Sequence, residues 1–353
     1  MAATSRRLDL PYLTLVAELV ERALDGQFDA DFDLSGLFKK RMVKDREYWY
    51  FRPSSRGNPN IREKYVGPAD DPAIASRVEN FASLKADYKY RQRLVSTLVR
   101  EARLFKPEQR VAGLLHILAK SGVFRLQACL VGTIAYQTYS TVLGYRLPDT
   151  ALQTGDIDIA QFHSVSVAVD DTIPPILEIL QSADSSFRRV PSLNDSLGTT
   201  RFSAAGGLRL EFLTPNRGSD DHTGRPATMP ALGGAAAEPL RFLDYLIHDP
   251  VRTVILDHGG IPVRVPEPAR FAVHKLIVAE RRKAGAAKDL KDLAQSRNIA
   301  EAFQELGRLS ELREAFGEAQ RRGQQWRTAL ERSLERLQQL GMPNANQLFA
   351  GKS

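Results

Sequence analysis

The sequence contains a single cysteine, Cys129, among its 353 residues. One thiol excludes a disulfide framework and any metal or cluster site built from cysteines, and it favours a reducing compartment. The six histidines are scattered, and no HExxH zinc motif occurs. No apolar run is long enough to span a membrane, because charged residues interrupt the segment that follows Arg6 and Arg7. We therefore expect a cytoplasmic protein with no membrane partner.

Two familiar nucleotide-binding motifs are also missing. The sequence has no GxGxxG, and its terminal Gly351-Lys352-Ser353 lacks the earlier glycine of a Walker A motif, since Asn346 occupies that position. The remaining composition, 43% hydrophobic and 26% charged, is that of an ordinary folded protein. The length leaves room for two or three domains.

The net charge of +7 is concentrated in one segment. Residues 39–64 contain nine lysines and arginines against three acids, a local excess of +6. A concentrated basic patch indicates a polyanionic partner. A solvated basic surface with no partner is the alternative that the sequence leaves open.

The first 122 residues form a predicted N-terminal region that is mostly helical. It contains one predicted hairpin, because an aromatic run and a second extended segment flank a turn rich in proline, serine and glycine. Apolar residues at helical spacing predict helices over 11–24, 74–104 and 107–120, and the hairpin falls within about 46–67.

Strand patterns begin in the second region, 123–266, and the third, 267–353, is again helical, with an interruption at Gly285. This order predicts an α+β protein in which helical regions flank a mixed sheet. Residues 218–238, rich in small residues, predict a mobile loop. The predicted strands are 126–131, 156–160, 208–213, 252–256 and 261–265, with a helix over 133–143.

Two aspartates, Asp156 and Asp158, stand two residues apart on one predicted strand. Their side chains therefore leave the same face of the sheet, while Ile157 and Ile159 enter the core. At ~4 Å and an effective dielectric of roughly 20, two carboxylates repel by about 4 kcal/mol unless a cation lies between them. Oxygen ligands with no nearby histidine or cysteine favour Mg²⁺ or Mn²⁺. Two aspartates that merely decorate an exposed strand are the alternative.

Two further features favour a metal site at Asp156 and Asp158 over two aspartates on an exposed strand. Residues 130–133 end a strand and open a helix, where free N–H groups and the helix dipole favour a phosphate, and Gly132 lets that phosphate approach the backbone. Thr133 supplies a hydroxyl beside it. Glu211 alternates with apolar residues on its own predicted strand and could present a third carboxylate beside the aspartates.

These residues together resemble the nucleotidyltransferase fold of polymerase beta-like enzymes. That pattern is hydrophobic-Gly-Ser, then acid-hydrophobic-acid, then a third acid on a neighbouring strand, and 131–133, 156–158 and Glu211 match it. The helical segments around Lys275 and 288–293 resemble those of abortive-infection toxin nucleotidyltransferases and related uncharacterised bacterial proteins. Thr133 replaces the family's serine, Gln137 stands where the toxins carry an arginine, and Asp156 follows Thr133 by 23 positions, more than is usual.

The resemblance implies a nucleotidyltransferase-fold mixed sheet and the transfer of a nucleoside monophosphate from a nucleoside triphosphate to a hydroxyl. For toxin-like members it also implies an antitoxin protein as partner. Asp289 and Asp292 are either part of this site or surface acids that pair with Lys288 or Arg281. The implied catalytic and Mg²⁺- or Mn²⁺-binding residues are Asp156, Asp158 and Glu211, and the implied nucleotide-binding residues are Gly132, Thr133 and Lys275.

The basic hairpin indicates which molecule accepts the nucleoside monophosphate. We expect this acceptor to be RNA, in particular the 3′ end of tRNA. Basic residues can bind phosphates while exposed rings stack on unpaired bases. The residues expected to do so are Arg46, Trp49, Arg52 and Arg56. Three alternatives stay open: the rings form the buried face of a small sheet, the chain is a non-catalytic nucleotide- or RNA-binding module, or it modifies a small molecule or a protein.

Overall fold

The computed structural model of the chain describes residues 6–25, 34, 36–43, 46–52, 63–148, 155–168, 172–191, 198–216, 225–281 and 287–351. The helices are α1 (Leu10–Asp25), α2 (Pro72–Arg100), α3 (Gln109–Lys120), α4 (Gly132–Leu143), α5 (His163–Ala168), α6 (Ile176–Ala183), α7 (Leu243–Leu246), α8 (Pro268–Arg281), α9 (Ala287–Glu305), α10 (Leu309–Arg321), α11 (Gln324–Gln339) and α12 (Ala345–Ala350). The strands are β1 (Leu37–Val43), β2 (Arg46–Arg52), β3 (Lys64–Pro68), β4 (Cys129–Val131), β5 (Asp156–Ala160), β6 (Arg188–Arg189), β7 (Arg201–Ser203), β8 (Arg209–Pro215), β9 (Ala227–Met229), β10 (Ala235–Leu240), β11 (Val251–Ile255) and β12 (Ile261–Val265). The predicted α+β class is confirmed.

The strands pair into a three-stranded, a seven-stranded and a two-stranded sheet. In the largest sheet the order is β4-β5-β8-β10-β9, and β7 also pairs with β8 and carries β6 at its other edge. The central strands β5, β8 and β10 are parallel, whereas β4, β7 and β9 run antiparallel to their neighbours. The sheet is therefore mixed, as predicted. Strands β4, β5 and β8, which carry the predicted glycine and the three predicted acids or lie directly before them, are neighbours in it.

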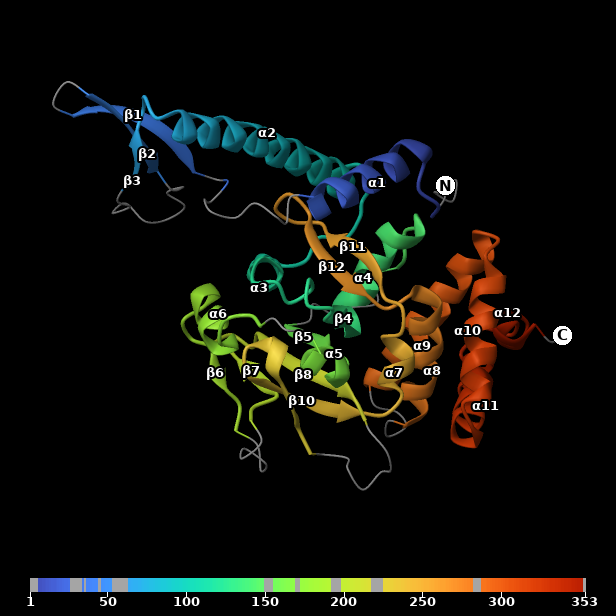
Figure 1. Ribbon diagram of the computed structural model, residues 1–353. Coiled ribbons are helices and arrows are strands. Elements are labelled where there is room, and N and C mark those ends of the chain that lie inside the picture. Colours follow the sequence, from blue (N-terminus) through green and yellow to red (C-terminus); the bar gives the residue numbers. More distant parts are fainter. Residues whose placement is uncertain are drawn as a thin grey trace.

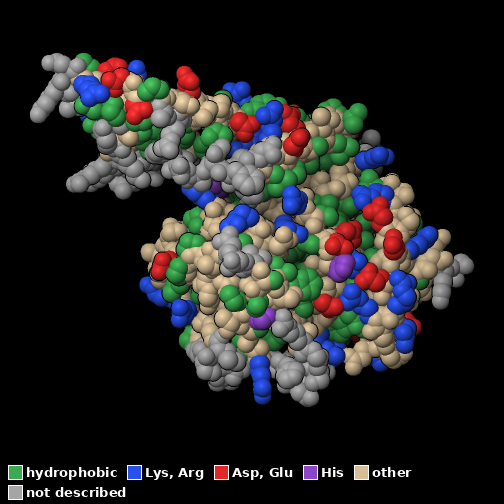
Figure 2. Space-filling model, viewed as in Figure 1, with side chains coloured by type: hydrophobic (Ala, Val, Ile, Leu, Met, Phe, Trp, Pro, Cys, Tyr) green, Lys and Arg blue, Asp and Glu red, His purple; other side chains and the backbone are tan. Residues whose placement is uncertain are grey.

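The N-terminal helices form a layer over this body, as Figure 1 shows. The amphipathic α1 packs against α2 and the β11–β12 hairpin, and its Leu19 and Ala23 share an apolar cluster with Leu94 and Leu98 of α2. The far end of α2 carries the sheet β1-β2-β3, which we call the arm and which extends away from the body (Figures 1 and 2). Within the described residues, no helix combines the length and apolar character needed to cross a bilayer.

The arm contains the predicted hairpin, as β2 paired with β3. Strand β1 was not predicted, because the three consecutive basic residues 39–41 hide the alternation typical of a half-buried strand. The first region is thus helical with a three-stranded sheet in place of a single hairpin. Strand β4 is also shorter than the predicted 126–131, since the chain is still turning at Leu126 and Gln127.

The loop predicted over 218–238 is wrong from residue 225 onward, where β9, a 3₁₀ turn (Pro230–Leu232) and the start of β10 lie. Ala235 to Ala237 are buried, and a Cβ atom on Gly233 would collide with the backbone of Pro174. The small residues therefore serve close packing between backbones. Residues 218–224 of this segment lie outside the described part of the chain.

The C-terminal helices α8 to α11 pack on one another at one side of the body (Figure 1). The sequence predicted one interruption, at Gly285, which lies outside the described residues. Within the described residues the structure adds three more, after α9, α10 and α11, where Gly307, Gly323 and Gly341 have φ of +71°, +128° and +88°. Glycine ends helices in this way because it carries no Cβ, although the apolar periodicity continues past it.

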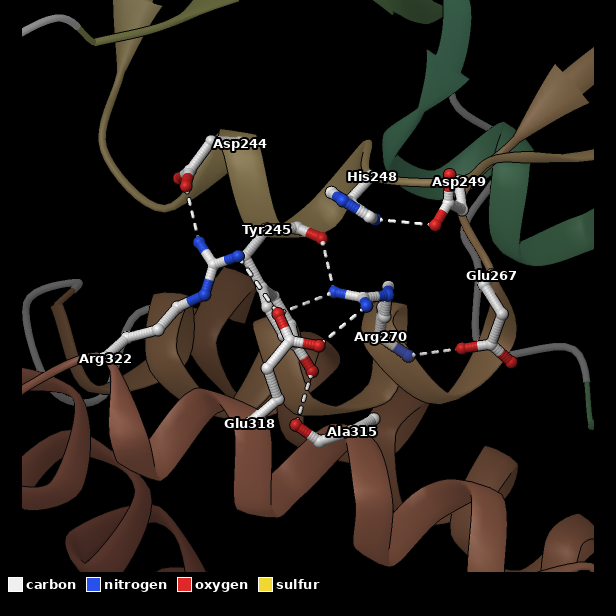
Figure 3. A network of polar contacts seen from close by, with 9 residues as sticks. All are labelled: Asp244, Tyr245, His248, Asp249, Glu267, Arg270, Ala315, Glu318 and Arg322. Carbon is white, nitrogen blue, oxygen red and sulfur yellow. Dashed lines mark hydrogen bonds and ion pairs between the residues drawn. The ribbon is translucent and has the colours of Figure 1, made fainter.

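A polar network fastens α10 to α7 and α8 (Figure 3). Arg270 of α8 donates two hydrogen bonds to Glu318 of α10, at 3.1 and 2.7 Å, and Arg322 donates another at 3.0 Å. The buried hydroxyl of Tyr245 in α7 donates to the carbonyl of Ala315 at 2.8 Å. Charge-assisted, bidentate contacts of this kind fix geometry as well as energy, so the C-terminal helices are held at a defined position against the body.

Candidate active site

The site begins where β4 ends and α4 starts. Gly132 is the first residue of α4 and has a φ of +71°, a left-handed conformation that glycine adopts without strain. A Cβ atom at this position would also collide with the Asp158 carboxylate oxygen Oδ2. The first turn of a helix leaves N–H groups that no intrahelical carbonyl accepts. The glycine predicted from the sequence is therefore required both by the turn and by the approach of Asp158.

The strand registers place three charged side chains in one row across the sheet. Asp158 of β5 is paired with Val131 of β4 on one side and with Glu211 of β8 on the other, and Glu211 is paired in turn with Arg201 of β7. Paired residues of neighbouring strands project to the same face. Asp158, Glu211 and Arg201 therefore share the face of the sheet to which Asp156 also belongs.

The second aspartate lies in a strongly repulsive environment. Burial, with the nearby Glu211 and Asp156 carboxylates, raises the pKa of Asp158 to about 6, although Lys275 and Lys288 act in the opposite direction. The ionised carboxylate is thus disfavoured where it stands. A bound divalent cation would relieve this repulsion.

Glu211 is held by the arginine beside it. The Arg201 Nε donates to Glu211 Oε1 at 2.6 Å, and this hydrogen bond raises the pKa of the guanidinium. Within the described residues, no three His, Cys, Asp or Glu side chains converge closely enough to bind a metal by themselves. Mg²⁺ commonly binds through one or two carboxylates and completes its coordination with water and substrate phosphates. The oxygen donors of Asp156 and Asp158 fit such a site.

Helices α8 and α9 bring basic side chains to the same region. Lys275 of α8 is largely buried, and its Nζ lies 2.5 Å from Asp292 Oδ1 on α9. Burial and the neighbouring charge of Lys275 lower the pKa of Lys291. Lys288 lies near enough to act on Asp158. The lysines of α8 and α9 therefore face the aspartates of the sheet.

Asp289 and Asp292 are not surface acids, and that alternative is wrong. Both are buried, whereas the alternative requires exposed side chains. Asp292 binds Lys275, while Asp289 lies 2.5 Å from Arg336 Nη2 on α11. A buried carboxylate needs such a partner, so these two acids hold α9 against α8 and α11.

A cavity of about 910 Å³ separates the acidic and basic groups. The sheet contributes Asp156, Asp158, Glu211 and Gly132 to its wall, and Lys275 contributes from α8. Thr133 is half-buried in the same helical turn as Gly132 but does not line the cavity. Five of the six predicted site residues are thus brought to one cavity.

Among the described residues, four further charged side chains line this cavity and were not assigned to the site from the sequence. Arg209 is paired with Asp156 across β5 and β8, and its alternation with Glu211 would have revealed it. Lys288 lies in the segment 288–293, whose resemblance to the toxins gave this lysine no role in the site. No strand pattern in the sequence pointed to Arg201 or Glu238. Strand β7, which carries Arg201, has only three residues, and the segment that contains Glu238 was predicted to be a loop.

The predicted RNA-binding residues do not all lie together. Arg46 and Arg52 are exposed and share one face of β2, whereas Trp49 lies on the opposite face. Phe51 is buried, in agreement with the alternative that rings form the covered face of a small sheet. Arg56 lies outside the described residues. The arm therefore has two faces of different character.

A protein-family profile described as "Nucleotidyltransferase" matches residues 109–321, more than half of the chain. Among solved structures, the chain is similar to an antigenic nucleotidyltransferase-like protein from Paracoccidioides brasiliensis, at 15% identity and a TM-score of 0.34, over 69% of this chain and 94% of that one. No curated protein matches it. The matched span contains the whole cavity described above and excludes the arm, α1 and α2. By its family match, the chain belongs to the nucleotidyltransferases.

Proposed function

We propose that the chain transfers a nucleoside monophosphate from a nucleoside triphosphate to a hydroxyl acceptor, with Mg²⁺ or Mn²⁺ as cofactor. A hydroxyl oxygen bonds to the α-phosphorus while the bond to the pyrophosphate oxygen breaks. The observation that carries the proposal is the cavity in which Asp156, Asp158 and Glu211 face the lysines of α8 and α9.

The aspartates are the proposed metal ligands. Asp158 is buried beside two other carboxylates, an arrangement whose repulsion a divalent cation would relieve. When bound, the metal would stabilise the charge that develops on the attacking and leaving oxygens. Asp156 is the more exposed of the pair, which suits a group that meets the substrate.

The remaining residues are assigned by their positions. The first turn of α4 at Gly132 suits a phosphate, and Lys275 and Lys288 would neutralise triphosphate charge from the opposite wall. Thr133 would assist from within that turn. Glu211 would act as a third metal ligand or orient and deprotonate the attacking hydroxyl once its carboxylate turns from Arg201.

The proposed acceptor is RNA, in particular the 3′ end of tRNA, on the strength of the basic and aromatic arm. An antitoxin partner rests on the resemblance to toxins alone. A non-catalytic nucleotide-binding module and a transferase for small molecules or proteins are the other candidates. Three acids kept together at an electrostatic cost favour an enzyme over a module.

Calorimetric titration of a nucleoside triphosphate tests the proposal without knowledge of the acceptor. Wild-type protein should bind at least one of the four nucleoside triphosphates in the presence of Mg²⁺ and should lose most of that affinity in EDTA. In the Asp158→Asn protein, the affinity should no longer depend on the metal. Arg313→Ala, on α10 and not among the residues that line the cavity, is the matched control and should bind like the wild type. Binding that is equal with and without Mg²⁺ would favour the non-catalytic module.

A further inference from the structure

The arm sorts its side chains onto two chemically different faces. Strands β1 and β2 are paired without a register break, from Leu37 with Arg52 to Val43 with Arg46. Alternate residues therefore share a face. One, the Phe51 face, carries Phe38, Lys40, Met42, Glu47, Trp49 and Phe51. The other, the Tyr50 face, carries Leu37, Lys39, Arg41, Arg46, Tyr48, Tyr50 and Arg52.

The Phe51 face is the one that packs on α2. Its Phe38 and Phe51 rings contact Phe81 of α2, with centroid distances of 4.8 and 5.9 Å. Lys40 completes this face, since it lies over the Trp49 ring and pairs with Glu47. The Tyr50 face therefore points away from α2.

The Tyr50 face is basic as well as aromatic. It carries four cations, and no acidic residue of β1 or β2 shares it. Arg41 lies over the Tyr50 ring at 5.5 Å, and Arg46 lies over the Tyr48 ring at 6.0 Å. The acids that reach it come from elsewhere: Glu63 pairs with Arg41, and Asp70 pairs with Arg46. Figure 2 shows the arm well beyond the rest of the surface.

We propose that the Tyr50 face binds unpaired RNA, with Lys39, Arg41, Arg46 and Arg52 on the phosphates and Tyr48 and Tyr50 against the bases. Both arginines are accessible to a phosphate, since their side chains are 61% and 56% exposed. The Arg46–Asp70 pair is weak in water because Asp70 is 66% exposed as well. Glu63, the partner of Arg41, is only 22% exposed. Phosphates can replace Glu63 and Asp70, and bases can stack on rings that now carry guanidinium groups. This inference rests on the proposed function for its choice of RNA.

The neighbours Arg41 and Lys40 provide a matched test. Each lies over one ring and pairs with one acid, yet they occupy opposite faces of β1. Fluorescence anisotropy would follow binding of a labelled single-stranded RNA of about 15 nucleotides across a range of salt. Loss of one phosphate contact should lower affinity about five-fold near 0.1 M salt and reduce the salt slope by about 0.7. Arg41→Ala should show this loss and Lys40→Ala should not.

Two more variants complete the experiment. The combined Lys39→Ala, Arg41→Ala and Arg52→Ala change should lower affinity about 100-fold. Tyr50→Leu should lower it about ten-fold and Tyr50→Phe much less, because a ring still stacks. All variants should keep the wild-type melting temperature and the wild-type calorimetric affinity for nucleoside triphosphate. Loss of RNA binding alone therefore concerns the arm, whereas loss of triphosphate binding concerns the proposed nucleotidyl transfer.

Equal affinity of the Arg41→Ala and Lys40→Ala proteins would overturn the inference. So would wild-type binding that is independent of salt, or an absence of RNA binding while triphosphate binding remains. Equal affinity for a double-stranded RNA of the same sequence would overturn the role of the rings, because paired bases cannot stack on them.

Discussion

Replacing Gly132 with alanine separates the cost of a backbone conformation from the cost of a displaced carboxylate. Gly132 and Gly307 have the same φ, +71°. Alanine in the left-handed region costs roughly 1–2 kcal/mol, so both variants should lose about that much unfolding free energy. At Gly307 the new methyl group meets nothing within 4 Å, whereas at Gly132 it collides with Asp158 Oδ2. Only Gly132→Ala must therefore move the aspartate.

The comparison needs two assays on both variants. Urea unfolding followed by circular dichroism should give similar losses, somewhat larger for Gly132→Ala. Calorimetry with Mg²⁺ and a nucleoside triphosphate should show at least a tenfold loss, about 1.4 kcal/mol, for Gly132→Ala and none for Gly307→Ala. Wild-type affinity in Gly132→Ala would refute the claim that this turn and Asp158 form one binding site.

Three further predictions concern buried or partly buried charges. The raised pKa of Asp158 means that the folded protein binds this proton more tightly than the unfolded chain, so unfolding free energy should fall by up to about 3 kcal/mol as the pH rises from roughly 4 to 6; Asp158→Asn, measured by urea unfolding without metal, should abolish this fall. Lys275→Met should cost about 3–5 kcal/mol because it leaves the Asp292 carboxylate buried without that lysine, and adding Asp292→Leu should recover most of the loss, whereas an additive double variant would contradict the pairing. Glu318→Ala should cost about 2–3 kcal/mol and speed amide exchange in α10; Glu311→Ala, which breaks an exposed pair, is the control and should cost under about 1 kcal/mol.

The acidic half of the site could be predicted because it depends on local patterns. The alternation around Asp156, Asp158 and Glu211 fixes which face each side chain leaves, and a glycine between strand and helix fixes the turn. The alternation around Glu211 allowed a third carboxylate beside the aspartates, but the register that pairs Glu211 with Asp158 is set by the tertiary structure.

The parts that were missed depend on contacts between distant segments. Arg201 reaches Glu211 from a three-residue strand too short to show a period. The pairing of Lys275 with Asp292 depends on how α8 crosses α9. A small-residue segment, 227–238, was predicted to be a loop because alanine and glycine have little local preference for strands, although here they allow close packing. On the arm, the sequence-based prediction put Trp49 and Arg46 in one binding surface, although strand alternation places them on opposite faces.

Transfer of label from a triphosphate tests the central claim most directly. The protein would be incubated with Mg²⁺ and total RNA or cell extract, with each nucleoside triphosphate labelled either at the α-phosphate or at the γ-phosphate. The account predicts that α-label enters an acceptor, that γ-label leaves as pyrophosphate, and that Asp156→Asn and Asp158→Asn lose the transfer. Transfer of γ-label, or transfer that survives both substitutions, would contradict it.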